Sequence, residues 1–204
     1  DKVESAMQTI LNDLNIDYTE AWGEAAFYGP KLDVQGKNVH GKEDTLFTVQ
    51  IDFSLATRFD MIYIDENGEK ARPLIIHRSS IGCYERTLAM LIEKYNGAFP
   101  MWLAPEQARV LSLTDRTADK AKEVRDKLFD LGLRAEADVR SEKLGKKIRE
   151  AQLDKVPYII VIGDKEAEQN VISVRHRSEG DLGTMTVEEF VAKALLEVAT
   201  KEIK

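Results

Sequence analysis

Residues 73–95 read PLIIHRSSIGCYERTLAMLIEKY and join two different apolar patterns through a glycine. The short apolar run at 74–76 predicts a buried strand, and the apolar residues after Gly82 recur at the spacing of a helix. A strand that passes through a glycine into a helix places Arg86 in the first helical turn, where its planar fork of donors suits an anion such as phosphate. The stretch therefore predicts a nucleotide site, although a core helix with a solvated arginine fits these residues alone equally well.

The residues before this stretch predict one helix and a mainly antiparallel sheet. Apolar residues from Val3 to Leu14 form one helical stripe, and a loop with two glycines and a proline follows at 23–30. Strands are expected at 31–34, 47–53, 59–64 and 69–76. The last two predict a hairpin, because the turn dipeptide Asn67-Gly68 lies between them.

The residues after this stretch change to an alternating pattern of strands and helices. Glycine and prolines at 96–105 mark the change, so we expect one domain over residues 1–102 and a second over residues 103–204. In the second domain the alternation predicts an α/β fold with a mixed, mostly parallel sheet flanked by helices. The expected strands are 108–113, 134–138, 156–162 and 171–175, and the expected helices are 117–131, 142–152 and 186–203.

The composition is typical of a soluble cytoplasmic protein. The chain has 204 residues, of which 43% are hydrophobic, enough for one large or two small domains. No apolar run reaches the roughly 18 residues of a membrane span, and the first residues do not resemble a signal peptide. The single cysteine, Cys83, excludes an internal disulfide and fits a reducing compartment. We therefore expect a cytoplasmic location and no membrane partner.

The charge pattern argues against a general nucleic-acid coat but leaves room for one local site. The formal net charge is -7, whereas the stretch RSEKLGKKIR at 140–149 carries five basic residues and one acidic residue. An acidic protein does not bind nucleic acid through charge alone, but a local basic patch can recognise one particular RNA.

Several separate stretches resemble the threonyl-tRNA synthetase family, which belongs to class II of the aminoacyl-tRNA synthetases. In the first half these are FYGPK at 27–31, TVQIDF at 48–53, the segment from His77 to Arg86, and FPMWLAP at 99–105. In the second half, residues 137–150, 155–158, 163–166 and 174–177 are similar to the anticodon-binding domain of that family. The stretches follow in the family's order along nearly the whole chain.

The resemblance implies the C-terminal piece of a class II antiparallel catalytic domain followed by an α/β anticodon-binding domain. Two of the three class II signature motifs would lie upstream, and only the third, ending at Arg86, is present. The intact enzyme would use ATP with Mg²⁺ to form threonyl-adenylate, transfer threonine to its tRNA, and act as a homodimer. We expect this chain to bind the anticodon arm of threonine tRNA but to be catalytically incomplete alone.

The resemblance assigns catalytic roles in the first half. Arg86 would neutralise the ATP γ-phosphate, and Glu85 would orient it. Tyr28 and Lys31 would line the pocket for threonine and nucleotide, and Gln50 would hydrogen-bond the substrate. For each, a solvated surface residue is the alternative.

Two stretches depart from the family pattern. Cys83 occupies a nucleotide-site position where serine is common in the family. Thr45-Leu46-Phe47 replaces a Gln-Cys-Gly tripeptide and so removes a polar side chain expected near the nucleotide.

His77 matches one of three zinc ligands in the family, where Zn²⁺ binds the amino and hydroxyl groups of threonine. A catalytic zinc site has three protein ligands and one open position. The other two ligands would lie outside this chain, so we expect no ordered zinc here.

His176 lies among arginines in the sequence, which predicts a position facing RNA or solvent.

In the second half the resemblance implies RNA contacts. Glu166 and Arg175 match family positions that read anticodon bases, since an acid can accept from a base amino group and an arginine can donate to guanine. Lys143, Arg149, Lys155 and Arg177 are expected at phosphates, with a solvated charge as the alternative.

Two other functions remain open from the sequence. One is a stand-alone RNA-binding or regulatory paralogue that retains the anticodon module without catalysis. The other is a related class II synthetase for proline, histidine or glycine, against which the Tyr28-Gly-Pro-Lys31 loop and the His77-Arg78 pair count.

Overall fold

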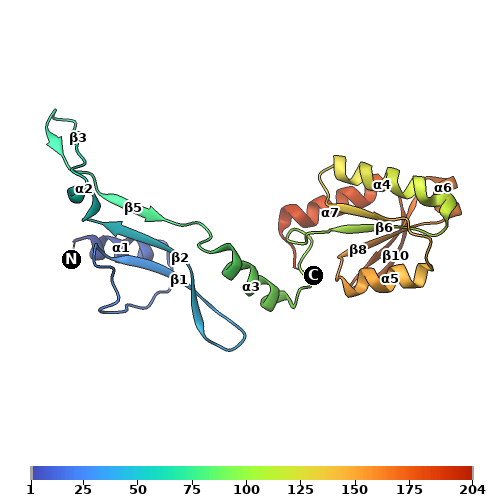
Figure 1. Cartoon of the computed structure of the whole chain (residues 1–204), viewed down its shortest axis with the longest axis horizontal. Coiled ribbons are helices and arrows are strands. Elements are labelled where there is room, and N and C mark those ends of the chain that lie inside the picture. The colour runs from blue at the N-terminus through green and yellow to red at the C-terminus, as the bar shows by residue number, and fades with distance from the viewer. Residues whose placement is uncertain (1, 204) are drawn as a thin grey trace. The chain divides into compact units, whose positions relative to one another are not determined.

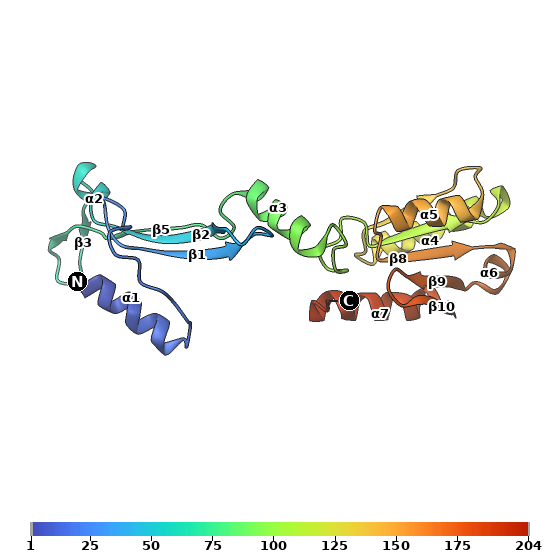
Figure 2. The ribbon, with the colours of Figure 1, turned by 90° about the horizontal axis from the view of Figure 1, so that it is seen from below.

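The computed structural model describes residues 2–203, and the chain forms two compact units, one extending to Met90 and one beginning at Leu91 (Figure 1). The first unit begins with helix α1 (Lys2–Asp13). Its sheet has the strand order β1-β2-β5, and both pairings are antiparallel (Figures 1 and 2). The bounds are Lys31–Lys37 for β1, Glu43–Asp52 for β2 and Ile75–Arg78 for β5. The predicted antiparallel sheet is confirmed.

The prediction of a strand over residues 59–64 is wrong for most of its length. A short helix, α2 (Leu55–Arg58), precedes it, and only β3 (Tyr63–Ile64) pairs with β4 (Lys70–Ala71). Asp60 has a positive φ of 47°, which turns the chain after the helix. Arg72 then ties this turn together by donating to the Ala56 carbonyl and to Asp60.

The predicted buried strand and core helix around Gly82 form, but they are not buried. In β5, Ile76 is 61% exposed, and in α3 (Tyr84–Tyr95) no residue is buried. The described part of the first unit has only two buried apolar residues, Leu11 and Ala56. Local pattern predicted the helix and a strand at the apolar run, although the strand expected over residues 69–76 is divided into β4 and β5. Burial depends on neighbours that the described residues do not supply.

The second unit is built on a five-stranded sheet in the order β10-β9-β8-β6-β7. β6 pairs in parallel with β7 and β8, and β9 and β10 continue the sheet antiparallel. The bounds are Ala108–Ser112 for β6, Ala135–Asp138 for β7, Tyr158–Ile162 for β8, Ile172–His176 for β9 and Gly180–Met185 for β10. The prediction of a mixed sheet is confirmed, but two of its four pairings are parallel and two are antiparallel, so the parallel pairings do not predominate.

Helices cover both faces of this sheet, with α4 (Ala118–Asp130) and α7 (Val187–Thr200) on one side of the strands and α5 (Leu144–Leu153) on the other (Figure 1). α4 and α7 bury the larger core, in which Leu128 and Phe190 are fully enclosed. α5 covers a smaller cluster on the other face. A 3₁₀ turn at Asp115–Thr117 and the short helix α6 (Asp164–Gln169) complete the unit.

The sequence did not predict α6 and β10. α6 is only six residues long and mostly charged, and β10 contains two glycines and a register shift against β9. Within residues 2–203, none of the helices has the length and apolar content needed to cross a membrane.

Candidate functional sites

A hollow of about 290 Å³ lies on one face of the first sheet. Gln50 on β2 pairs with His77 on β5, and Asp52 lies two residues further along β2 on the same face. The lining consists of Phe27, Tyr28, Gln50, Asp52, Ser54, Leu55, Arg58 and His77. Three of the residues that the sequence singled out therefore lie together: Tyr28, Gln50 and His77.

The loop that carries Tyr28 is fastened along β2. The amide of Phe53 donates to the Tyr28 carbonyl oxygen, and the Tyr28 hydroxyl donates to Oε1 of Gln50. Glycine is needed at position 29, because a Cβ there would overlap the carbonyl oxygen of Ile51. The loop and the strand thus form one continuous wall of the hollow.

Asp52 is a buried carboxylate in this wall, with 1% of the residue exposed. Its Oδ1 accepts from the amides of Ser54 and Leu55 at 2.7 and 2.9 Å, and its Oδ2 lies 2.9 Å from Nε2 of His77. Burial acts to raise the pKa of the Asp52 carboxyl, but the hydrogen bonds from His77 and the two amides hold that pKa below its usual range. The carboxylate therefore stays ionised at neutral pH.

Lys31 does not line the hollow. Its Nζ lies 2.6 Å from Oδ2 of Asp33, and this hydrogen bond raises the pKa of the lysine. In the free protein the ammonium group is thus paired within β1, so a contact with a substrate would require it to leave or share Asp33.

Arg86 and Glu85 have different partners from those that the sequence suggested. The Arg86 guanidinium donates to the backbone carbonyl of Thr45 at 2.7 Å. Thr45 is the first residue of the segment that departs from the family pattern. Glu85 accepts from the Cys83 thiol at 3.0 Å, a hydrogen bond that lowers the pKa of the Glu85 carboxyl. No contact between Glu85 and Arg86 is found in residues 2–203, so the orienting role of Glu85 has no geometric support.

The described residues contain no group of three His, Cys, Asp or Glu side chains that could hold a metal ion. His77 nevertheless fits one ligand of a zinc site. One of its ring nitrogens faces a buried carboxylate, the arrangement typical of metal-binding histidines, and its ring lines the hollow.

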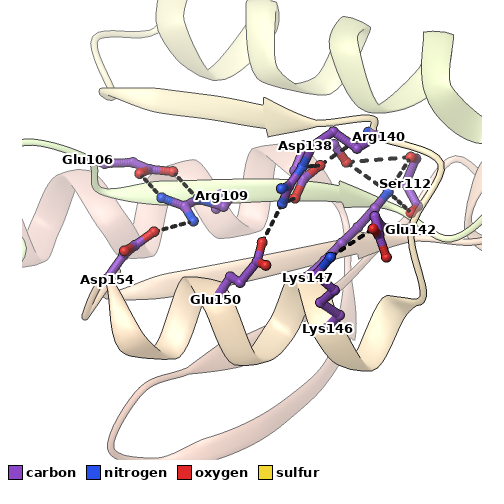
Figure 3. A network of polar contacts seen from close by, with 10 residues as sticks. All are labelled: Glu106, Arg109, Ser112, Asp138, Arg140, Glu142, Lys146, Lys147, Glu150 and Asp154. Carbon is purple, nitrogen blue, oxygen red and sulfur yellow. Dashed lines mark hydrogen bonds and ion pairs between the residues drawn. The ribbon is translucent and has the colours of Figure 1, made fainter.

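In the second unit, polar side chains gather where the parallel strands end (Figure 3). Lys147 projects from α5 and is 1% exposed. Its Nζ donates to the carbonyl oxygen and hydroxyl of Ser112 at 3.0 and 3.2 Å, and to the Asp138 carbonyl at 3.2 Å. Because Ser112 and Asp138 are the last residues of β6 and β7, this one amine holds two strand ends together.

Much of the basic stretch at 140–149 is neutralised within the protein (Figure 3). Arg140 pairs with Asp138 and with Glu150 at 2.5 and 2.6 Å, and Lys146 pairs with Glu142 at 2.7 Å. Lys143 and Arg149 are exposed and form no ion pair in the part of the chain that the structure describes. They are the two cations of this stretch that remain available to a ligand.

Glu166 and Arg175 are related through Ser173 on β9, which binds Glu166 and precedes Arg175 by two residues. Glu166, in the first turn of α6, accepts from the Gly163 amide at 3.0 Å and from the Ser173 hydroxyl at 2.9 Å. Arg175 follows Ser173 by two residues, so both point to the same face of the sheet. On the neighbouring strand β8, Val161 pairs with Ser173 and Ile159 pairs with Arg175. Both β8 residues pack with α5, so Ser173 and Arg175 lie on the face of the sheet that α5 covers.

Lys155 and Arg177 donate to backbone carbonyls instead of facing solvent. Lys155 donates to the carbonyl of Asn96, and Arg177 donates to the carbonyls of Lys155 and Ala98 at 3.0 and 2.9 Å. These contacts fix the segment at 96–98 to the sheet.

The prediction that His176 faces RNA or solvent is wrong. The residue is 3% exposed, and its ring lies 4.7 Å from that of Tyr158 in the core of the second unit.

Comparisons with known proteins agree with this architecture. The family model described as the tRNA synthetase class II core domain (G, H, P, S and T) matches residues 1–95, and that of the anticodon binding domain matches residues 107–197. Threonine–tRNA ligase of Clostridium perfringens is 62% identical over 202 residues, 99% of this chain. The chain belongs to the threonyl-tRNA synthetase family.

Other members of the family give the same result. The ligase of Listeria monocytogenes is 51% identical over 200 residues. The crystal structure of the RNA-binding domain of threonyl-tRNA synthetase from Cryptosporidium parvum superposes with a TM-score of 0.83 at 33% identity, covering 95% of this chain and 49% of that one. The chain spans 31% of the length of the curated relatives. Membership in the threonyl family removes the alternative of a proline, histidine or glycine enzyme.

Two residues central to these candidate sites were missed by the sequence reasoning. Asp52 follows Gln50 by two residues, and in a strand this spacing places both on one face. Lys147 lies within the apolar stripe of α5 formed by Leu144, Ile148 and Ala151, so its helical position distinguishes it from a surface lysine. Both signals were present in the sequence.

Acidification should destabilise the second unit of this synthetase chain. The hydrogen bond from Arg140 lowers the pKa of the Asp138 carboxyl, and burial of Glu166, which acts to raise its pKa, is outweighed by the bonds from backbone amides and Ser173. A carboxyl with a folded pKa below its unfolded value stabilises the fold above the unfolded pKa of about 4. That contribution is lost as the pH falls through the folded pKa.

Urea unfolding at pH 7 and pH 3 measures this loss. The Asp138→Asn variant should show a smaller difference between the two pH values than the wild type, because one of the titrating groups is gone. An unchanged difference would contradict the assignment.

Proposed function

We propose that this chain reads the anticodon arm of threonine tRNA with its second unit and contributes one wall of the ATP and threonine site with its first. The main support for this proposal is the position of the Glu166 carboxylate. Hydrogen bonds from the Gly163 amide and the Ser173 hydroxyl hold it on the sheet face that also bears Arg175. A fixed acceptor beside a guanidinium suits the amino groups and the acceptor edge of unstacked bases. The family match over residues 107–197 supports this reading.

Lys143 and Arg149 are proposed as phosphate contacts, since both are exposed on or beside α5, which covers the same sheet face as Arg175. Phosphate contacts fix the position of the RNA and carry no base information. Lys155 and Arg177 are proposed instead as supports of the second unit, because their donors already serve backbone carbonyls.

The intact enzyme is proposed to be a cytoplasmic homodimer that forms threonyl-adenylate with ATP and Mg²⁺ and then charges its tRNA. Arg86 would leave the Thr45 carbonyl and neutralise the γ-phosphate as pyrophosphate departs. Tyr28 and Gln50 would orient substrate groups in the hollow. His77 would hold Zn²⁺, which supplies a Lewis acid for the amino and hydroxyl groups of threonine.

A binding protein without catalysis is the second candidate. The observation that favours it is the Thr45-Leu46-Phe47 segment. It has no counterpart of the glutamine that the family resemblance places near the nucleotide, and the carbonyl oxygen of Thr45 accepts a hydrogen bond from Arg86. An intact second class II motif in the upstream sequence would exclude this candidate. Threonine-dependent ATP–pyrophosphate exchange by this chain alone would contradict the claim that it is catalytically incomplete.

The deciding experiment compares binding of the threonine tRNA anticodon arm with anticodon-swapped arms at one fixed salt concentration. Arg175→Met and Glu166→Gln should each reduce the discrimination between arms by about 5- to 100-fold, since one base contact contributes about 1–3 kcal/mol. Glu166→Gln retains an acceptor for the Gly163 amide, so the fold is preserved.

Lys143→Ala and Arg149→Ala serve as matched controls. Each should weaken binding to all arms equally and reduce the slope of log affinity against log salt by about one. Equal binding of matched and swapped arms by the wild-type chain, or unchanged discrimination in both base-contact variants, would contradict the proposed function.

A further inference from the structure

Asp52 has a fixed orientation in the wall of the hollow. Its Oδ1 accepts hydrogen bonds from the amides of Ser54 and Leu55, and its Oδ2 lies 2.9 Å from Nε2 of His77. The two hydrogen bonds from these amides disfavour rotation of the carboxylate, because rotation would leave two half-buried amides without an acceptor. The two oxygens of Asp52 therefore have separate and constant partners.

This orientation determines which nitrogen of His77 carries the hydrogen. An ionised carboxylate can only accept hydrogen bonds, so the ring nitrogen that faces Oδ2 must be the donor. In a neutral imidazole the other nitrogen then has the lone pair. Nδ1 of His77 has no hydrogen-bond partner among the described residues, and the side chain is 42% exposed at the hollow.

We propose that Asp52 is a positioning residue that holds His77 as the Nε2–H tautomer and keeps the Nδ1 lone pair available to a divalent metal ion. The metal part of this inference rests on the proposed function, in which His77 is a zinc ligand, whereas the tautomer stands on the geometry alone. The chemistry is that of a carboxylate–histidine pair, in which the outer carboxylate fixes the tautomer and the direction of the ring.

The surroundings of the ring favour the same tautomer. The Tyr28 ring lies edge-on to His77 with the ring centres 6.0 Å apart, and the Tyr28 hydroxyl is already bound to Gln50. The aromatic contact limits rotation of the imidazole, and the tyrosine hydroxyl does not compete for Nδ1. Asp52 is thus the group that decides the state of the ring.

An Asp52→Asn exchange should invert the tautomer without removing a hydrogen bond. The amides of Ser54 and Leu55 need an acceptor, so the asparagine Oδ1 takes their side and its NH₂ group faces His77. An amide nitrogen can only donate, and Nε2 must then accept. The hydrogen moves to Nδ1, which loses its lone pair, as expected when an amide replaces the carboxylate partner of a histidine.

Nitrogen-15 NMR of the histidine rings tests the tautomer directly in this chain. The chain has only three histidines, so a His77→Gln variant identifies the His77 signals without ambiguity. At pH 8 the wild type should show a protonated Nε2 and an unprotonated Nδ1, and Asp52→Asn should exchange the two types. Asp33→Asn, which removes a carboxylate paired with Lys31, is the matched control and should leave the His77 signals unchanged.

The wild-type spectrum alone is decisive: a protonated Nδ1 on His77 would overturn the proposal, even if Asp52→Asn failed to fold. An unchanged tautomer in a folded Asp52→Asn chain would overturn it as well. The metal part is tested in the intact enzyme, where the other two expected ligands are present. There, Asp52→Asn should weaken the retention of Zn²⁺ against a competing chelator by about 10-fold or more. Unchanged retention would overturn the role of Asp52 towards the metal, whereas the spectra of this chain decide the tautomer.

Discussion

Lys147→Ala should lower the free energy of unfolding of the second unit by about 3 to 5 kcal/mol, whereas Lys146→Ala should change it by less than about 0.5 kcal/mol. The two lysines are neighbours on α5 and identical in chemistry. Lys147 is enclosed, and its amine is shared by Ser112 and the Asp138 carbonyl, while Lys146 forms an exposed pair with Glu142 (Figure 3). The alanine variant of Lys147 leaves a cavity and buried carbonyls without their donor.

Lys147→Met separates the cavity from the hydrogen bonds. Methionine retains most of the volume but cannot donate, so this variant should lose about 1 to 3 kcal/mol. Urea unfolding in a Trp22→Phe background measures all three variants, because Trp102 in the second unit is then the only tryptophan. Equal losses for Lys146→Ala and Lys147→Ala would show that Lys147 does not hold the strand ends.

These two lysines also show what the sequence predicts well and what it does not. The sequence contains a basic stretch at 140–149, and this stretch predicts a surface that binds RNA. Five of its residues are basic, yet Arg140, Lys146 and Lys147 have partners inside the protein. The acids that neutralise Arg140 come from β7 and from the next turns of α5, and such pairings depend on the folded arrangement.

The sheet of the second unit could be predicted because its signals are local. Its strands β6 and β8 are mostly apolar, and glycine or proline lies close to most strand ends. β10 begins with a glycine but has no apolar run, and it pairs with β9 through a register shift that its sequence does not indicate. α6 depends on a cap between Glu166 and Gly163 that a mostly charged sequence does not reveal.

The site in the first unit could be predicted only in part. The strand that carries Gln50 and the one that ends beside His77 were predicted, but the pairing of β2 with β5 that places Gln50 opposite His77 was not. The partner of Arg86 could not be predicted either, because Thr45 lies 41 residues away in the sequence and contributes a backbone carbonyl, which any residue type would supply. Resemblance to the family indicated the residues, and long-range geometry determined their partners in the free protein.

Gly82→Ala should destabilise the first unit by about 3 kcal/mol or more, while Gly68→Ala should cost about 1 to 2 kcal/mol. Both glycines have a positive φ, 71° for Gly82 and 79° for Gly68, so alanine suffers the same backbone strain at either position. They differ in space: a Cβ at Gly68 meets nothing within 4 Å, whereas a Cβ at Gly82 would overlap the carbonyl oxygen of Leu46. The difference between the two variants therefore isolates the contact.

Amide hydrogen exchange of β2 and β5 measures this effect strand by strand. A loss of 3 kcal/mol corresponds to an increase in exchange rate of about 100-fold, and the Gly68 variant should stay near 10-fold. Leu46 adjoins Thr45, whose carbonyl binds Arg86, so the backbone that must move in Gly82→Ala is the backbone that anchors the arginine. If the two variants exchanged at the same rate, Gly82 would serve only as a turn residue. If Gly82→Ala alone opens β2, the close approach at Gly82 is what places Arg86 beside its acceptor.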